Sequence, residues 1–103
     1  MINIKTSGYS ISAEGHAGYA EYGSDIVCSA VTGLLYTIAE CIRREHEAGN
    51  IQDMEITLEP GCALIKCIPV KHMSRIDTIY GTVKTGLEIV ADMYPKYVHI
   101  ENF

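Results

Sequence analysis

Two short stretches near the start of the chain alternate apolar and polar residues. Residues 1–5 and 9–13 each place their apolar side chains on one face, and these side chains are Ile2, Ile4, Tyr9, Ile11 and Ala13. A period of two residues is typical of a half-buried β-strand. Because the turn-forming segment Thr6-Ser7-Gly8 lies between the two stretches, the pattern predicts a β-hairpin.

The longest periodic segment of the chain runs from Asp25 to Ala48. Its apolar residues recur at steps of three and four positions, and they are Val27, Ala30, Val31, Leu34, Ile38, Cys41 and Ile42. This spacing is typical of an amphipathic helix that buries one stripe. Gly49 follows the segment, and glycine takes the left-handed conformation that commonly ends a helix. We therefore expect one long helix that stops at Gly49.

Alternation returns in the second half of the chain. Residues 54–59 alternate, Pro60-Gly61 follows, and residues 63–68 run back as a second, largely apolar stretch. Proline fixes one backbone angle of a type II turn and glycine supplies the positive φ that such a turn needs. The pattern predicts a second hairpin, closed by this turn.

Helical spacing then resumes and continues as far as Pro95. Ser74 has Asp77 three residues later, a pattern that predicts the start of a helix. Gly81 and Gly86 each weaken this helix by about 1 kcal/mol relative to alanine, which indicates close packing against another element. The sequence leaves open whether that element is the chain's own sheet or a second copy. Residues 97–101 are expected to form a last strand.

The order of predicted elements is ββ-α-ββ-α-β. This order fits an α+β fold, an α/β sandwich in which two helices pack on a mixed sheet. A chain of 103 residues is the usual size of one domain, and no linker, repeat or low-complexity segment divides residues 1–103.

Composition excludes several classes of function. Lys and Arg number 8 against 13 Asp and Glu, a net charge of −5 without a basic stripe, so we expect no nucleic-acid partner. The longest apolar run, residues 26–31, is far short of the ~20 residues that cross a bilayer, so no membrane association is expected. The four cysteines favour free thiols in a reducing, cytoplasmic protein. Neither C-x-x-C nor H-E-x-x-H occurs, so we expect no metal and no other cofactor.

Candidate chemistry gathers between the second strand and the first helix. Gly15, Gly18 and Gly23 give this segment unusual backbone freedom. If Ser24 or Asp25 caps the helix, Cys28 lies at the end of its first turn, where the helix dipole and unpaired amides favour a thiolate.

The same loop supplies a candidate base for this thiol. A strand end followed by a returning loop permits His16 to reach Cys28, take its proton and return it to a leaving amine. The amides at the helix start, including that of Cys28, are candidate donors to an oxyanion. From the residues alone, plainer roles stay open. Cys28 is then a small buried apolar residue, His16 a solvated or capping residue, and Asp25 only an N-cap.

The paired segments Gly15-His16-Ala17 and Gly23-Ser24-Asp25-Ile26-Val27-Cys28-Ser29-Ala30-Val31 resemble the signature of the ribosomal-processing cysteine protease family, Prp or YsxB-like. The resemblance covers nearly the whole chain and includes Tyr94-Pro95-x-Tyr97-Val98. It implies a homodimeric endopeptidase with a Cys/His pair that removes an N-terminal extension from a large-subunit ribosomal protein. It also implies, as an alternative substrate class, the capsid or scaffold proteins that phage relatives of the family are expected to trim.

Under this resemblance, Cys28 and His16 take the catalytic positions and Asp25 takes the acid position of the family. Thr32 stands where the family usually has serine, and Ser29 replaces a usual alanine or glycine, which bears on the shape of the substrate pocket.

The predicted peptide substrate meets a loop over residues 17–23 that we interpret as a lid. Tyr19 and Tyr22 either contact the substrate or are exposed loop tyrosines, and both interpretations stay open.

Two other classes of function stay open beside the endopeptidase. One is a non-enzymatic, ribosome-associated binding module, and the other is a structural or dimerisation domain built on the second helix.

Overall fold

The computed structural model of the chain describes residues 1–21 and 25–103. Its elements in chain order are β1 (Ile2–Ser7), β2 (Ser10–Glu14), α1 (Ile26–Glu47), β3 (Ile51–Glu59), β4 (Cys62–Pro69), α2 (Met73–Met93) and β5 (Val98–Asn102). The predicted order ββ-α-ββ-α-β is therefore confirmed.

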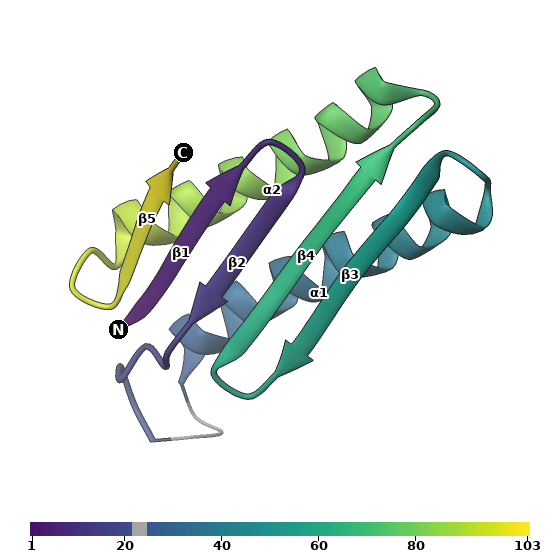
Figure 1. The fold of residues 1–103 in the computed structure, drawn as a ribbon. Coiled ribbons are helices and arrows are strands. Elements are labelled where there is room, and N and C mark those ends of the chain that lie inside the picture. Colours follow the sequence, from purple (N-terminus) through teal and green to yellow (C-terminus); the bar gives the residue numbers. More distant parts are fainter. Residues whose placement is uncertain (22–24) are drawn as a thin grey trace.

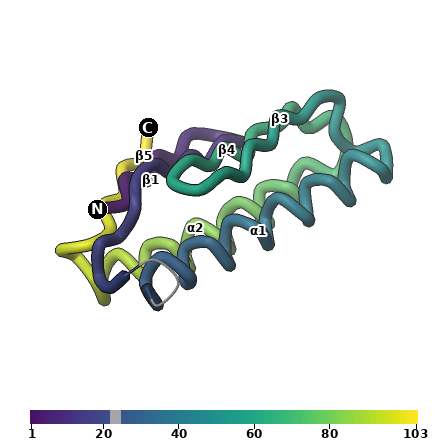
Figure 2. Tube along the Cα trace, turned by 90° about the horizontal axis from the view of Figure 1, so that it is seen from below, coloured from purple at the N-terminus to yellow at the C-terminus, as the bar shows by residue number. Residues whose placement is uncertain are grey.

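The strands form one mixed sheet in the order β3-β4-β2-β1-β5. Neighbouring strands are antiparallel, except that β5 runs parallel to β1 with Ile2 opposite Val98. Both helices lie side by side on one face of this sheet (Figure 1), and the edge view separates the two layers (Figure 2). This is the two-layer α+β fold that the pattern predicts.

The core fills the space between the helices and the sheet. Its most deeply buried side chains are Ile4, Ile11, Ile38, Ile42, Ile65, Ile76, Leu87 and Val27. In α1 the buried stripe includes Leu35 and Ala39, whereas Leu34 and Cys41 are only half-buried and Ala30 is exposed. The prediction is therefore confirmed at Val27, Val31, Ile38 and Ile42 and wrong at Ala30, Leu34 and Cys41. Although α1 has the length and hydropathy of a membrane-spanning helix, its apolar stripe is used in this core.

The C-terminal end of α1 matches the prediction. Gly49 has φ +82°, its N–H donates to the His46 carbonyl (3.0 Å), and the Asn50 N–H donates to the Glu45 carbonyl (3.0 Å). This pair of bonds is a Schellman motif, which uses carbonyls that the helix leaves unpaired.

The predicted cap of α2 at Ser74 is wrong. The helix begins at Met73 after His72, which has φ 52° and makes no side-chain capping bond. The chain arriving from β4 is already fixed here, because the N–H groups of Val70 and Lys71 donate to the Asn50 carbonyl (2.9 and 3.2 Å). These tertiary hydrogen bonds thus override the local capping pattern at Ser74. Likewise β3 begins at Ile51, three residues earlier than predicted.

The two helices approach closely at one glycine. A Cβ at Gly86 would lie 3.0 Å from a methyl group of Leu34, so the prediction of close packing is confirmed there, against α1 rather than the sheet. At Gly81 no described atom lies within 4 Å of the corresponding position, so that prediction does not hold within this chain.

Candidate active site

Strand register brings the end of β2 beside the turn between β3 and β4. Glu14 of β2 lies opposite Cys62, the first residue of β4, and the Gly15 N–H donates to the Gly61 carbonyl (2.9 Å). Gly15 has φ +97°, and a Cβ there would overlap the carbonyl oxygen of Met1. Only glycine fits this position, so Gly15 fixes where the next residue, His16, leaves the sheet.

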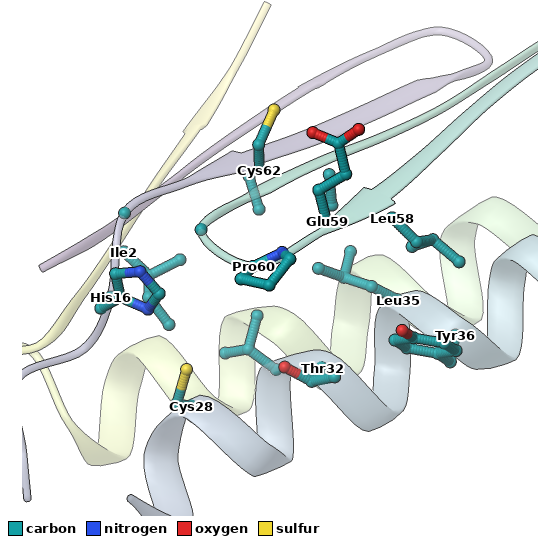
Figure 3. Close-up of a pocket in the computed structure, with 15 residues that line it drawn as sticks. Ile2, His16, Cys28, Thr32, Leu35, Tyr36, Leu58, Glu59, Pro60 and Cys62 are labelled. Carbon is teal, nitrogen blue, oxygen red and sulfur yellow. The ribbon is translucent and has the colours of Figure 1, made fainter. Parts of the chain in front are cut away.

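His16 lies at the exposed end of this segment, while its neighbour Ala17 is buried in the core. The imidazole therefore extends from a backbone that is held on both sides. Across the cavity, Cys28 is half-buried on the first turn of α1, and its Sγ points toward the imidazole of His16 (Figure 3). The structure thus brings together the two residues that the sequence predicts as a catalytic pair.

Asp25 is the N-cap of α1, which settles the choice between Ser24 and Asp25. Its Oδ1 accepts a hydrogen bond from the Cys28 N–H (2.9 Å), and its Oδ2 accepts from the N–H groups of Tyr19 (3.0 Å) and Ala20 (3.4 Å). Burial of the carboxylate acts to raise its pKa, but the backbone donors, with Cys28 first among them, outweigh this effect and hold the pKa of Asp25 below its usual value. Asp25 thus joins the helix start to the loop that follows His16.

This arrangement corrects the expectation that the Cys28 amide donates to an oxyanion. That N–H is already bonded to Asp25. The Val27 N–H also contributes to lowering the pKa of Asp25. An N-cap side chain accepts from amides of the first turn, and here it occupies the Cys28 N–H that the sequence assigned to an oxyanion.

Two cavities meet at the pair. One, of about 190 Å³, runs between α1 and the β3–β4 turn, and apart from His16 and Cys28 its lining includes Val31, Leu35, Leu58 and Pro60. The other opens on the loop side and is lined in part by Gly18, Asp25 and Thr32. Thr32 lines both cavities one helical turn after Cys28 (Figure 3).

Tyr19 is 44% exposed and does not line either cavity. Its ring instead packs edge-to-face against Tyr94 (centroids 5.7 Å apart) and Tyr97 (5.2 Å). The structure therefore places Tyr19 as an anchor between the loop and the segment that joins α2 to β5. Tyr22, Gly23 and Ser24 lie outside the described residues, and so does the end of the predicted lid.

Comparison with known proteins identifies the family. The family model described as cysteine protease Prp matches residues 1–99. The chain belongs to the cysteine protease Prp family. It is therefore a peptide hydrolase that uses a thiol, which favours the enzyme over the binding module.

Relatives of the family match along nearly the whole chain. The ribosomal processing cysteine protease Prp of Mycoplasma genitalium is 30% identical over 100 residues, which cover 97% of this chain and 94% of the relative. The protein of the same name from Mycoplasma pneumoniae is 28% identical over 102 residues, 99% and 95% of the two chains. The essential ribosomal processing protease Prp from S. aureus, in complex with a covalently linked product peptide, has the same fold, with a TM-score of 0.83 and 19% identity over all of both chains. The S. aureus Prp complex with a substrate peptide gives a TM-score of 0.76, also at 19% identity over all of both chains.

The sequence pattern alone indicates no role in the site for the Pro60-Gly61 turn or for Tyr94 and Tyr97. The turn was predicted as a hairpin connection only, and its contact with His16 depends on the pairing of β2 with β4. A signal for the tyrosines was present in the Tyr94-Pro95-x-Tyr97-Val98 segment, but nothing in its spacing relates it to Tyr19.

Proposed function

We propose that this chain is an endopeptidase in which Cys28 is the nucleophile and His16 is the general base and acid. The observation that carries the proposal is that Cys28 and His16 face each other across a cavity lined by apolar side chains (Figure 3). Cys62 lines the same cavity, but its side chain points away from Cys28 and His16 (Figure 3). Cys41 and Cys67 line neither of the two cavities at the pair.

In the reaction, His16 takes the Cys28 proton and the sulfur attacks the carbonyl carbon of the scissile peptide bond. As the tetrahedral intermediate collapses, the C–N bond breaks and the protonated His16 gives its proton to the leaving amine. A thioester to Cys28 remains. Water then attacks this thioester with His16 again as the base, which releases the new C-terminal carboxylate and restores the thiol.

Gly15, Asp25 and Thr32 position or surround the catalytic pair and take no part in the bond changes. Gly15 fixes the departure of His16 from the sheet. Asp25 holds the first turn of α1 and the loop together. Thr32 lines both cavities beside Cys28, and its methyl group, which serine lacks, narrows the space there.

The proposed substrate is the N-terminal extension of a large-subunit ribosomal protein. The ribosomal processing role of the Mycoplasma relatives supports this assignment. The test is to incubate the purified protein with the full-length ribosomal precursor and to sequence the new N-termini. We expect one cleavage near the N-terminus, lost in Cys28→Ala and retained in Cys62→Ala.

Cleavage by folded Cys28→Ala would contradict the assignment of the nucleophile. An intact ribosomal precursor beside a cleaved phage capsid or scaffold precursor would contradict the substrate and leave the endopeptidase.

We also propose a cytoplasmic homodimer. All four cysteines fall within the described residues and are free thiols, which fits a reducing compartment. Ile89 and Met93 of α2 are more than half exposed, at 53% and 64%, and an interface between two copies would cover such side chains. Light scattering of the purified protein gives twice the monomer mass if this is correct and the monomer mass if it is not.

A further inference from the structure

The turn between β3 and β4 lies directly against the imidazole of His16. A Cβ built on Gly61 would be 2.9 Å from Nε2 and 3.4 Å from Cε1 of the ring, and real Cβ contacts under 3.0 Å are essentially never observed. The imidazole therefore occupies space that a side chain at residue 61 would take. The ring can lie in this place only because residue 61 is glycine.

The same turn also holds the backbone next to His16. The Gly61 carbonyl accepts the hydrogen bond from the Gly15 N–H (2.9 Å), and Gly61 itself has φ +76°, a conformation that glycine adopts without strain. One turn thus contacts the ring of His16 and, through its carbonyl, the residue before it. Backbone and side chain of the base are fixed by a single element that belongs to another hairpin.

We propose that Gly61 is a positioning residue of the active site, which sets the place of the His16 imidazole relative to Cys28. This inference rests on the proposed roles of His16 and Cys28. A methyl group at residue 61 meets the far end of a rotatable side chain, so the ring moves and the backbone does not. Besides the backbone strain that alanine meets at this φ, substitution of Gly61 therefore displaces the base from its place beside Cys28.

The experiment compares Gly61→Ala with Gly49→Ala. Both glycines have similar positive φ angles, +76° and +82°, so alanine introduces the same backbone strain at each, but no described atom lies within 4 Å of a Cβ at Gly49. Gly49 lies 21 residues after Cys28 at the other end of α1, about 30 Å away for a helix. The readouts are the unfolding midpoint and the rate of Cys28 alkylation by iodoacetamide as a function of pH.

We expect both variants to lose similar stability. Gly61→Ala should in addition slow Cys28 alkylation near neutral pH by about tenfold or more, which is part of the ~10²- to 10⁴-fold that a positioned base contributes, and should alter its pH profile. Gly49→Ala should keep the profile of the unmodified protein. In a His16→Ala background, Gly61→Ala should have no further effect on alkylation, because its action passes through the imidazole.

An unchanged profile in Gly61→Ala would overturn the inference, and so would an equal further loss in the His16→Ala background. If Gly61→Ala does not fold, Gly61→Asn replaces it with Gly49→Asn as control, since asparagine tolerates positive φ but still carries a Cβ. Failure of the proposed function is distinguishable, because His16→Ala alone would then leave alkylation unchanged.

Discussion

Replacement of Tyr19 tests whether the loop is held by aromatic contacts. Tyr19→Ala removes two edge-to-face ring pairs, with Tyr94 and Tyr97. Such pairs contribute about 0.5–1.5 kcal/mol each, and the partial exposure of Tyr19 favours the lower half of that range, so docking of the loop loses about 1–2 kcal/mol. Since 1.4 kcal/mol is a factor of ten, the ratio of docked to undocked loop falls about 5- to 30-fold, and the docked fraction falls by no more than this.

The assay is kcat/KM on a peptide that spans the cleavage site, together with hydrogen exchange of the amides in residues 17–21. Tyr19→Ala should lower kcat/KM within that limit and speed exchange, because Tyr19 and Ala20 donate to Asp25 from this segment. Tyr19→Phe keeps both ring contacts and should resemble the unmodified protein. Tyr97→Leu removes one ring partner without touching either cavity, and should give a smaller loss in the same direction. If Tyr97→Leu leaves kcat/KM and exchange unchanged while Tyr19→Ala lowers kcat/KM, Tyr19 acts on the substrate directly and the reasoning is refuted.

Three other substitutions test the choice of thiol, the cap at Asp25 and the contact of Gly15 with Met1. Cys41→Ala should cost about 1 kcal/mol of stability and spare activity, since Cys41 is half-buried away from both cavities; a folded but inactive variant would show that the wrong thiol was chosen. Because the pKa of folded Asp25 is lowered, its stabilisation is complete above the unfolded value of ~3.9 and is lost as pH falls through the folded pKa. The difference in Tm between the unmodified protein and Asp25→Asn should therefore narrow below about pH 4, and a constant difference would argue against this role. Gly15→Ala should destabilise more than Gly8→Ala, which shares a positive φ but has open space around it, and equal urea midpoints would contradict the contact with Met1.

Most of the fold follows from local patterns in the sequence. The apolar period separates strands from helices, and glycine marks both the end of α1 at Gly49 and the turn at Gly61. The errors arise where tertiary contacts compete with local preference. His72, not Ser74, precedes α2, because hydrogen bonds to the Asn50 carbonyl fix the chain just before the helix. Leu34 is only half-buried and packs on Gly86 of α2.

The site likewise has parts that the local sequence indicates and parts that depend on tertiary contacts. The first turn of α1, which carries Cys28, and its cap at Asp25 are local, and the sequence indicates both. The contact of His16 with Gly61 depends on which strands pair. The contact of Tyr19 with Tyr97 joins residues that are 78 positions apart in the chain. Periodicity carries no information on such pairings. The occupied Cys28 amide was also missed, because the N-cap and the oxyanion donor compete for the same N–H and the sequence does not rank them.

The pairing of Cys28 with His16 is tested most directly by the alkylation rates of all four cysteines, measured by mass spectrometry from about pH 5 to 9, a window around the free histidine and cysteine values. We expect Cys28 to react faster than Cys41, Cys62 and Cys67 near neutral pH, and His16→Ala to remove this advantage in a folded protein. Equal rates for Cys28 with and without His16 across the whole range would contradict the pairing.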